Sequence, residues 1–282
     1  MTKVDSAMWT AADERSLSRL LAAIAADDLA AALLAVEGAS EDEAAHALGW
    51  LESWARELRD SLGHSGSSPH AAAAGLYSVL VEGANFTGDA TDYHAPRNSA
   101  FTEVVRRRSG QPILLSSVWM VVGQRAGLDV VGVGLPGHFI VRVGGVDGVL
   151  VDPFGAGRAL VESDCADIVS QLSGGALPWE RCYLTAASTG AIIERVLRNL
   201  IHACNRGRRR RRLYRAVRML ATLREGDPGA TLLHARLAED LGAVCLAQQL
   251  YEGIAARFPG TCECTVARRR LADVTDAATR LH

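Results

Sequence analysis

His138 and Asp152 occupy matching places in two neighbouring predicted strands. Residues 139–143 and 148–151 are rich in β-branched side chains, and the turn 144–147 (Gly-Gly-Val-Asp) between them predicts a β-hairpin. A hairpin centred on Gly145 pairs residues whose numbers add up to 290, so His138 faces Asp152. A cysteine hydrolase or acyl transferase needs an imidazole that takes a proton and a carboxylate that fixes its tautomer. The hairpin therefore predicts an acid–base pair.

The same register divides the side chains of the hairpin between two faces. One face carries no charged residue within the strands, so we expect it to be the more buried one. Its members are Phe139, Val141, Val143, Val149 and Val151. His138 and Asp152 share the opposite face.

Four stretches in this part of the chain form a recognisable series. They are Tyr93–Ser99 (Tyr-His-Ala-Pro-Arg-Asn-Ser), Arg106–Ser116 (Arg-Arg-Arg-Ser-Gly-Gln-Pro-Ile-Leu-Leu-Ser), Gly132–Phe139 (Gly-Val-Gly-Leu-Pro-Gly-His-Phe) and Val151–Phe154 (Val-Asp-Pro-Phe). The series resembles bacterial transglutaminase-like proteins that join a papain-type core to C-terminal tetratricopeptide repeats, and the resemblance runs from about Ala71 to the C-terminus. It implies an α+β fold with a helical N-terminal part, a core with a small antiparallel sheet, and C-terminal α-helical hairpins.

The nucleophile that this resemblance implies is missing. In active enzymes of the family a cysteine follows a Gly-x pair at the start of the helix before the first strand, where the helix N-terminus favours the thiolate. Here Gly110-Gln111 is followed by Pro112, and no cysteine lies between Met1 and Asp164. The resemblance therefore implies a pseudoenzyme that acts as a protein-binding, peptide-binding or regulatory module.

Two other interpretations of the pair stay open. Ser116 could replace the cysteine, with His138 as base and Asp152 as its orienting partner, in a serine-dependent amide or ester hydrolase or acyl transferase. Alternatively, His138 and Asp152 satisfy each other's polar groups at the end of a sheet and have only a structural role.

A degenerate cleft that still binds a ligand is a further hypothesis. Its candidate ligand-binding residues are Tyr93, Arg97, Asn98 and Ser117. For Arg97, the alternative is a structural role in which its guanidinium tethers the loop to backbone carbonyls.

Helices are predicted on both sides of these residues. Leucines recur at helical spacing up to Leu62, and Ser40 with Glu43 predicts a capping box. Asn98 or Ser99 is expected to cap the helix that contains Phe101. Another helix is expected from Pro112, a residue suited to the first helical turn, to Gly127.

The chain becomes helical again from Ile192 onward. The signals of helical hairpins are two Ala and Pro pairs at equal spacing and two glycines at turns: Ala216 with Pro228, Ala247 with Pro259, Gly207 and Gly242. This pattern is typical of tetratricopeptide repeats, although the prolines lie closer together than usual. We therefore predict a transglutaminase-like domain over residues 1–188 and tetratricopeptide-like repeats over 189–282, with a protein or peptide as partner.

A run of arginines lies at the first predicted turn of the repeats. It comprises Arg206, Arg208, Arg209, Arg210, Arg211 and Arg212. Such a patch can attract nucleic acid, which gives an alternative function as a nucleic-acid-associated regulator, or it can be a solvated turn. Since Tyr214 is the only aromatic residue nearby, sequence-specific recognition of single strands is not expected.

Composition limits the remaining classes. The 282 residues carry a formal net charge of -2, which gives no global attraction to nucleic acid or anionic membranes. The six cysteines lack the Cys-x-x-Cys spacing of structural zinc sites, so we expect no metal and no cofactor. The longest apolar run, Ile113–Gly123, is shorter than a membrane span. We expect a soluble, cytoplasmic protein that does not bind membranes.

Overall fold

The computed structural model describes residues 8–63, 68–91, 95–206 and 209–279. The predicted α+β class is confirmed: helices predominate, and the larger of two sheets is small and antiparallel. The chain forms two compact units, one of Ala22–Val196 and one of Met1–Leu21 with Leu197–His282. The division between Val196 and Leu197 lies eight residues after the predicted boundary at 188, and residues up to Leu21 belong with the C-terminal helices.

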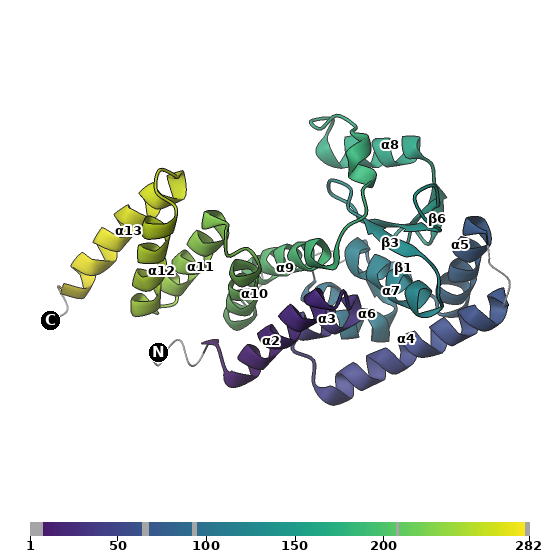
Figure 1. Ribbon diagram of the computed structural model, residues 1–282, viewed down its shortest axis with the longest axis horizontal. Helices are drawn as coiled ribbons and strands as arrows, with labels where there is room; N and C mark the ends of the chain where they lie inside the picture. Colours follow the sequence, from purple (N-terminus) through teal and green to yellow (C-terminus); the bar gives the residue numbers. More distant parts are fainter. Residues whose placement is uncertain (1–7, 64–67, 92–94, 207–208, 280–282) are drawn as a thin grey trace. The chain divides into compact units, whose positions relative to one another are not determined.

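The sheet of the first unit has the strand order β3 (Val130–Val133), β4 (Ile140–Val143), β5 (Val149–Asp152) and β6 (Arg158–Leu160), and every neighbouring pair is antiparallel. Figure 1 labels β3 and β6 of this sheet. The turn residue Val146 lies at the centre of the β4–β5 hairpin.

The predicted register of this hairpin is wrong by two residues. The ladder pairs Val141 with Val151 and Val143 with Val149, so paired numbers add up to 292. Gly144 and Gly145 adopt φ of +92° and +82°, and the Gly148 N–H donates to the carbonyl of Gly145. The turn is therefore longer than predicted, because two glycines supply left-handed conformations that other residues avoid. A shift of two residues keeps each side chain on its predicted face.

Helices cover both faces of the sheet. On one face, Gly132 lies so close to the Phe139 ring and to Met120 of α7 (Pro112–Arg125) that a Cβ would meet them at 2.7 and 3.0 Å. The other face packs against α8 (Glu162–Ser173) through Val133, Leu135, Ile140, Leu160, Cys165 and Val169. Four of the five residues on the face predicted to be the more buried one, Phe139, Val141, Val143 and Val151, are at most 2% exposed, whereas Val149 is half-buried.

Further elements of this unit precede the sheet: α3 (Leu29–Glu37), α4 (Glu41–Leu62), α5 (Pro69–Tyr77), a π-helix η1 (Ser78–Gly83), β1 (Thr87–Gly88), a 3-10 helix η2 (Pro96–Ser99), α6 (Phe101–Arg107) and β2 (Ser109–Gly110). A second 3-10 helix, η3 (Arg181–Leu184), follows the sheet, and α2 (Ala11–Ala25) begins in the other unit and ends in this one. The short strands β1 and β2 pair in parallel. The capping box of Ser40 and Glu43 at the start of α4 is confirmed.

The predicted cap of α6 is wrong. Ala100 occupies the N-cap position and provides no side-chain hydrogen bond. Instead, the Glu37 carboxylate at the end of α3 accepts the N–H of Thr102 at 3.1 and 3.3 Å. Asn98 lies in η2, and its side chain bonds to Asp89 and Arg107. A cap supplied by a residue 65 positions away leaves no local sequence signal.

Consecutive helices form the C-terminal part: α9 (Thr189–Arg206), α10 (Arg210–Leu223), α11 (Pro228–Asp240), α12 (Val244–Arg257) and α13 (Cys262–Thr279) (Figure 1). From α10 onward each helix packs against the next. Gly242, with φ of +79°, makes the turn between α11 and α12, whereas Gly207 lies outside the described residues. Small and apolar residues fill the contacts, including Ala235, Ala238, Ala247, Tyr251, Ile254 and Ala267. Among the described residues, none of these or the other helices is long and apolar enough to cross a membrane.

Candidate functional site

The imidazole and the carboxylate predicted from the hairpin meet in the structure. Nε2 of His138 lies 3.0 Å from Oδ1 of Asp152, and the two side chains are only 9% and 13% exposed. If the observed ladder is continued by one pair, Ile140 lies opposite Asp152. His138 precedes Ile140 by two residues and lies on the same face, so its ring reaches the carboxylate diagonally across the two strands. The predicted contact forms in spite of the wrong register.

The two atoms are close, but their contact does not have the geometry of an aligned hydrogen bond. Nε2 of His138 is buried and, within the described part of the chain, has no hydrogen-bond partner with good angles. Oδ1 of Asp152 also accepts the N–H of Phe154 at 3.0 Å, which fixes the carboxylate within its own turn. The pair is therefore held close, with the carboxylate more firmly fixed than the ring.

Tight packing encloses the Asp152 side of the pair. The Phe154 ring meets the His138 ring edge to face, with 6.0 Å between centroids. A Cβ at Gly155 would lie 2.8 Å from Oδ2 of Asp152, and a Cβ at Gly88 would lie 2.6 Å from the Phe154 carbonyl. These close approaches require glycine and leave little freedom for the carboxylate.

The two candidate serines lie on α7 and are completely buried. The Ser116 hydroxyl donates to the carbonyl of Phe139 at 3.1 Å, and the Ser117 hydroxyl donates to the carbonyl of Ile113 at 2.8 Å. Within the described part of the chain, neither hydroxyl is hydrogen-bonded to the His138 ring. The structure thus brings Ser116 next to the backbone that carries His138, but not to the imidazole.

The candidate ligand-binding residues before α6 have different surroundings. Arg97 is exposed, and Tyr93 lies outside the described residues. Asn98 is fully buried: its amide donates to Asp89 at 3.1 Å and accepts from Arg107 at 2.9 Å. The amide of Asn98 is therefore engaged inside the protein.

Two charged residues of this network, Asp89 and Arg107, were not predicted as site residues from the sequence. They form an ion pair of 3.3 Å, with side chains 8% and 23% exposed. Next to them, the Ser99 hydroxyl donates to the buried Gln111 side chain at 3.2 Å. Polar groups buried together in this way stabilise each other and fix the loop before α7.

Cys165 is a cysteine on the same side of the sheet as the pair. It is fully buried in the apolar cluster under α8. Burial raises the pKa of its thiol to about 11, and the negative charges of Asp164, Asp152 and Glu162 act in the same direction. Among the described residues, no thiol is hydrogen-bonded to His138. This environment disfavours a reactive thiolate.

The arginine run is only partly described. Arg209, Arg210, Arg211 and Arg212 are exposed, whereas the Arg206 side chain and Arg208 lie outside the described residues. Arg211 lies 3.1 Å from the buried carboxylate of Asp13, which also pairs with Arg215 at 2.8 Å.

Part of the run therefore has a structural partner at the start of α2. Burial would raise the pKa of Asp13, but hydrogen bonds from Thr10, the charge of Arg215 and a hydrogen bond from Arg211 together hold that pKa below its usual range. The carboxylate thus stays ionised at neutral pH and anchors both arginines.

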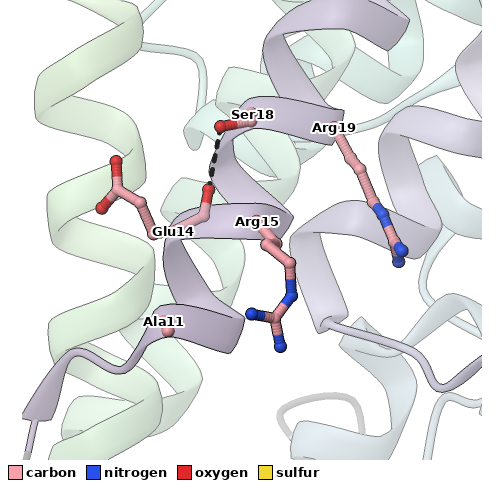
Figure 2. A pocket seen from close by; sticks show the side chains of 5 residues that line it. All are labelled: Ala11, Glu14, Arg15, Ser18 and Arg19. Atoms are coloured by element: carbon pink, nitrogen blue, oxygen red, sulfur yellow. Dashed lines mark hydrogen bonds between the residues drawn. The ribbon is translucent and has the colours of Figure 1, made fainter.

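A separate hollow of about 520 Å³ lies beside α2. Figure 2 shows its lining residues Ala11, Glu14, Arg15, Ser18 and Arg19, with Glu14 directed away from the two arginines. None of the predicted site residues that the structure describes lines this hollow. In the ranges that the structure describes, no three His, Cys, Asp or Glu side chains cluster as metal ligands would.

His138 and Asp152 lie in a region of the chain that is similar to known proteins. The family described as the transglutaminase-like superfamily matches residues 45–198. A UPF0162 protein of Pseudomonas aeruginosa is 33% identical over 215 residues, which cover 76% of this chain and 72% of that protein. No solved structure matches the chain.

Other relatives match shorter regions. UPF0162 proteins from two strains of Xylella fastidiosa are 37% identical over 131 residues, or 45% of this chain, and the match spans about half of their length (47%). F-box only protein 21 of Homo sapiens is 26% identical over 133 residues, which cover 44% of this chain and 19% of that protein.

Proposed function

Because the chain belongs to the transglutaminase-like superfamily, we propose that it is a non-catalytic member that binds a protein or peptide partner in the cytoplasm. The observation that carries this proposal is an acid–base pair to which, among the described residues, no serine hydroxyl or cysteine thiol is hydrogen-bonded. His138 and Asp152 are 3.0 Å apart, but the nearby Ser116 hydroxyl is hydrogen-bonded to a backbone carbonyl.

Transamidation through a thioester requires a thiolate, and the sequence up to Asp164 contains no cysteine. Cys165 lies in an apolar cluster, and its pKa of about 11 leaves the thiol protonated at neutral pH. A serine could act only after giving up its hydrogen bond to Phe139 and turning toward the ring. Both features support a binding role over a covalent mechanism.

The C-terminal helices are the proposed binding surface. We interpret residues 189–282 as tetratricopeptide-like hairpins and residues 1–188 as the transglutaminase-like domain. The small buried residues Ala216 and Ala247, together with the turn at Gly242, support this interpretation. Leu233 on α11 and Val244 on α12 are 41% and 36% exposed, so the hairpins present apolar side chains to solvent. Stacked helical hairpins use such surfaces to bind extended peptides.

A turnover assay tests the non-catalytic part of the proposal. Purified protein is incubated with a glutamine peptide and a labelled primary amine, and separately with an activated ester. We expect the product to form no faster with the wild type than with His138→Ala. Turnover that is lost in His138→Ala would refute the proposal.

A binding experiment tests the second part. Peptides are selected on the immobilised full chain from a random phage-displayed library, and their affinities are measured by isothermal titration calorimetry. We expect the double variant Leu233→Asp with Val244→Asp to bind at least roughly tenfold more weakly. Leu177→Asp is the matched control, because Leu177 is 44% exposed and lies outside the C-terminal helices. Selected peptides that bind both variants equally well would contradict this assignment of the surface.

A further inference from the structure

The residue His138 closes a tight turn that begins at Leu135. Its N–H donates to the Leu135 carbonyl at 3.1 Å, and Gly137 within the turn has φ of +78°. Gly137 is exposed, whereas Leu135 and His138 are buried. The backbone carbonyls at the base of this turn therefore need partners from within the protein.

Arg195 of α9 supplies two of these partners. One guanidinium nitrogen donates to the Leu135 carbonyl at 3.0 Å, and another donates to the His138 carbonyl at 2.7 Å. The guanidinium also lies over the Phe139 ring, 5.4 Å from its centroid. A planar fork that binds two carbonyls and stacks on the next side chain restricts the turn more than a single donor would.

The next carbonyl along the chain is bound by a residue from another helix. Ser116 of α7 donates to the carbonyl of Phe139 at 3.1 Å, from a completely buried position. Two successive peptide carbonyls, those of His138 and Phe139, are thus held by side chains from α9 and α7. Contacts 57 and 23 residues apart in sequence fix the orientation of the backbone that carries the imidazole.

We propose that Ser116 and Arg195, which we call the His138 clamp, are positioning residues that hold the imidazole against Asp152. The ring of His138 lacks an aligned hydrogen bond of its own to the carboxylate, so its position depends on the backbone. This proposal goes beyond the proposed function and gives Ser116 a role other than that of a nucleophile.

The test uses the full chain with Ser116→Ala and Arg195→Met, each of which removes one side of the clamp. Ser117→Ala is the matched control for Ser116, because Ser117 is equally buried but bonds within its own helix. Arg198→Met is the control for Arg195, since Arg198 is exposed one turn further along α9. Arg195→Lys keeps the charge but replaces the two donor nitrogens of the planar guanidinium by a single ammonium nitrogen.

Two measurements report on each variant. Imidazole ¹⁵N chemical shifts from NMR report the tautomer and surroundings of His138, and Asp152→Asn provides the reference for a lost partner. Amide hydrogen exchange reports the His138 N–H. For both clamp variants we expect shifts that move toward those of Asp152→Asn and exchange at His138 that is roughly tenfold faster, the effect of about one lost hydrogen bond. Arg195→Lys should recover part of the wild-type exchange.

The clamp is refuted if both clamp variants fold and keep the wild-type ¹⁵N shifts and exchange rate, or if both control variants change them equally. Circular dichroism and exchange at β3 show whether a variant is folded. Peptide affinity and turnover do not enter this test, so a failure of the proposed function would be seen separately. If Ser116→Ala proves unfolded, Arg195→Met and Arg195→Lys still decide the outcome.

Discussion

Replacing Glu37 by glutamine should make the stability of the fold less dependent on pH. The carboxylate of Glu37 accepts the Thr102 N–H at the start of α6. Burial raises the pKa of this carboxyl from 4.5 to about 7, and the charge of Glu43 adds to the shift, whereas hydrogen bonds from Thr102 and Phe101 oppose it. The folded protein thus holds a proton on Glu37 more tightly than the unfolded chain does.

The magnitude follows from this difference in pKa. A carboxyl whose pKa rises on folding stabilises the fold fully below pH 4.5, and this stability is lost as the pH rises through about 7. The difference between these two pKa values corresponds to about 3 kcal/mol. Since the side chain keeps some contact with solvent, we expect about 2 kcal/mol in practice. Glutamine stays neutral at every pH and keeps an acceptor for Thr102.

The assay is urea unfolding of the wild type and Glu37→Gln at about pH 5 and about pH 8. The free energy of unfolding of the wild type should fall by about 2 kcal/mol more than that of the variant over this range. Glu57→Gln is the control, because Glu57 is an exposed carboxylate on α4. Parallel pH profiles for the wild type and Glu37→Gln would show that the carboxyl does not titrate as its burial requires.

Three further predictions concern the pair and the arginines. Gly155→Ala should place a Cβ 2.8 Å from Oδ2 of Asp152, so the free energy of unfolding should fall by about 1–3 kcal/mol, measured by urea unfolding. Asp13→Asn should lower the free energy of unfolding by about 2 kcal/mol, because Arg211 and Arg215 lose the negative charge that they pair with. Hydrogen exchange in α2 should become faster in this variant. Replacing Arg209–Arg212 by serine should leave binding to a DNA duplex unchanged at physiological salt in fluorescence anisotropy. Salt-dependent binding by the wild type that the serine variant loses would support the nucleic-acid alternative instead.

Local patterns were enough to predict much of the core. The β-branched residues of 139–143 and 148–151 predicted β4 and β5, and Ser40 with Glu43 predicted the start of α4. The His138 and Asp152 contact was predicted with the wrong register, because the side-chain period of two keeps both residues on one face after a shift of two. Turn length was the uncertain step, since two adjacent glycines allow several turn geometries.

The rest depended on contacts between distant parts of the chain. Arg195 binds carbonyls 57 and 60 residues away, and Glu37 caps a helix 65 residues away. A side chain that binds a backbone carbonyl leaves no trace in the local pattern at either position. For the same reason, the direction of the Ser116 hydroxyl could be determined only from the folded chain.

The most direct test of the central claim is covalent labelling of the native protein. A fluorophosphonate probe reports an activated serine, iodoacetamide reports a thiolate, and mass spectrometry identifies the modified residue. We predict that neither Ser116 nor Cys165 is labelled in the folded wild type, and that His138→Ala gives the same result. Labelling of either residue that disappears in His138→Ala would show that the imidazole activates a nucleophile, and would contradict a non-catalytic role.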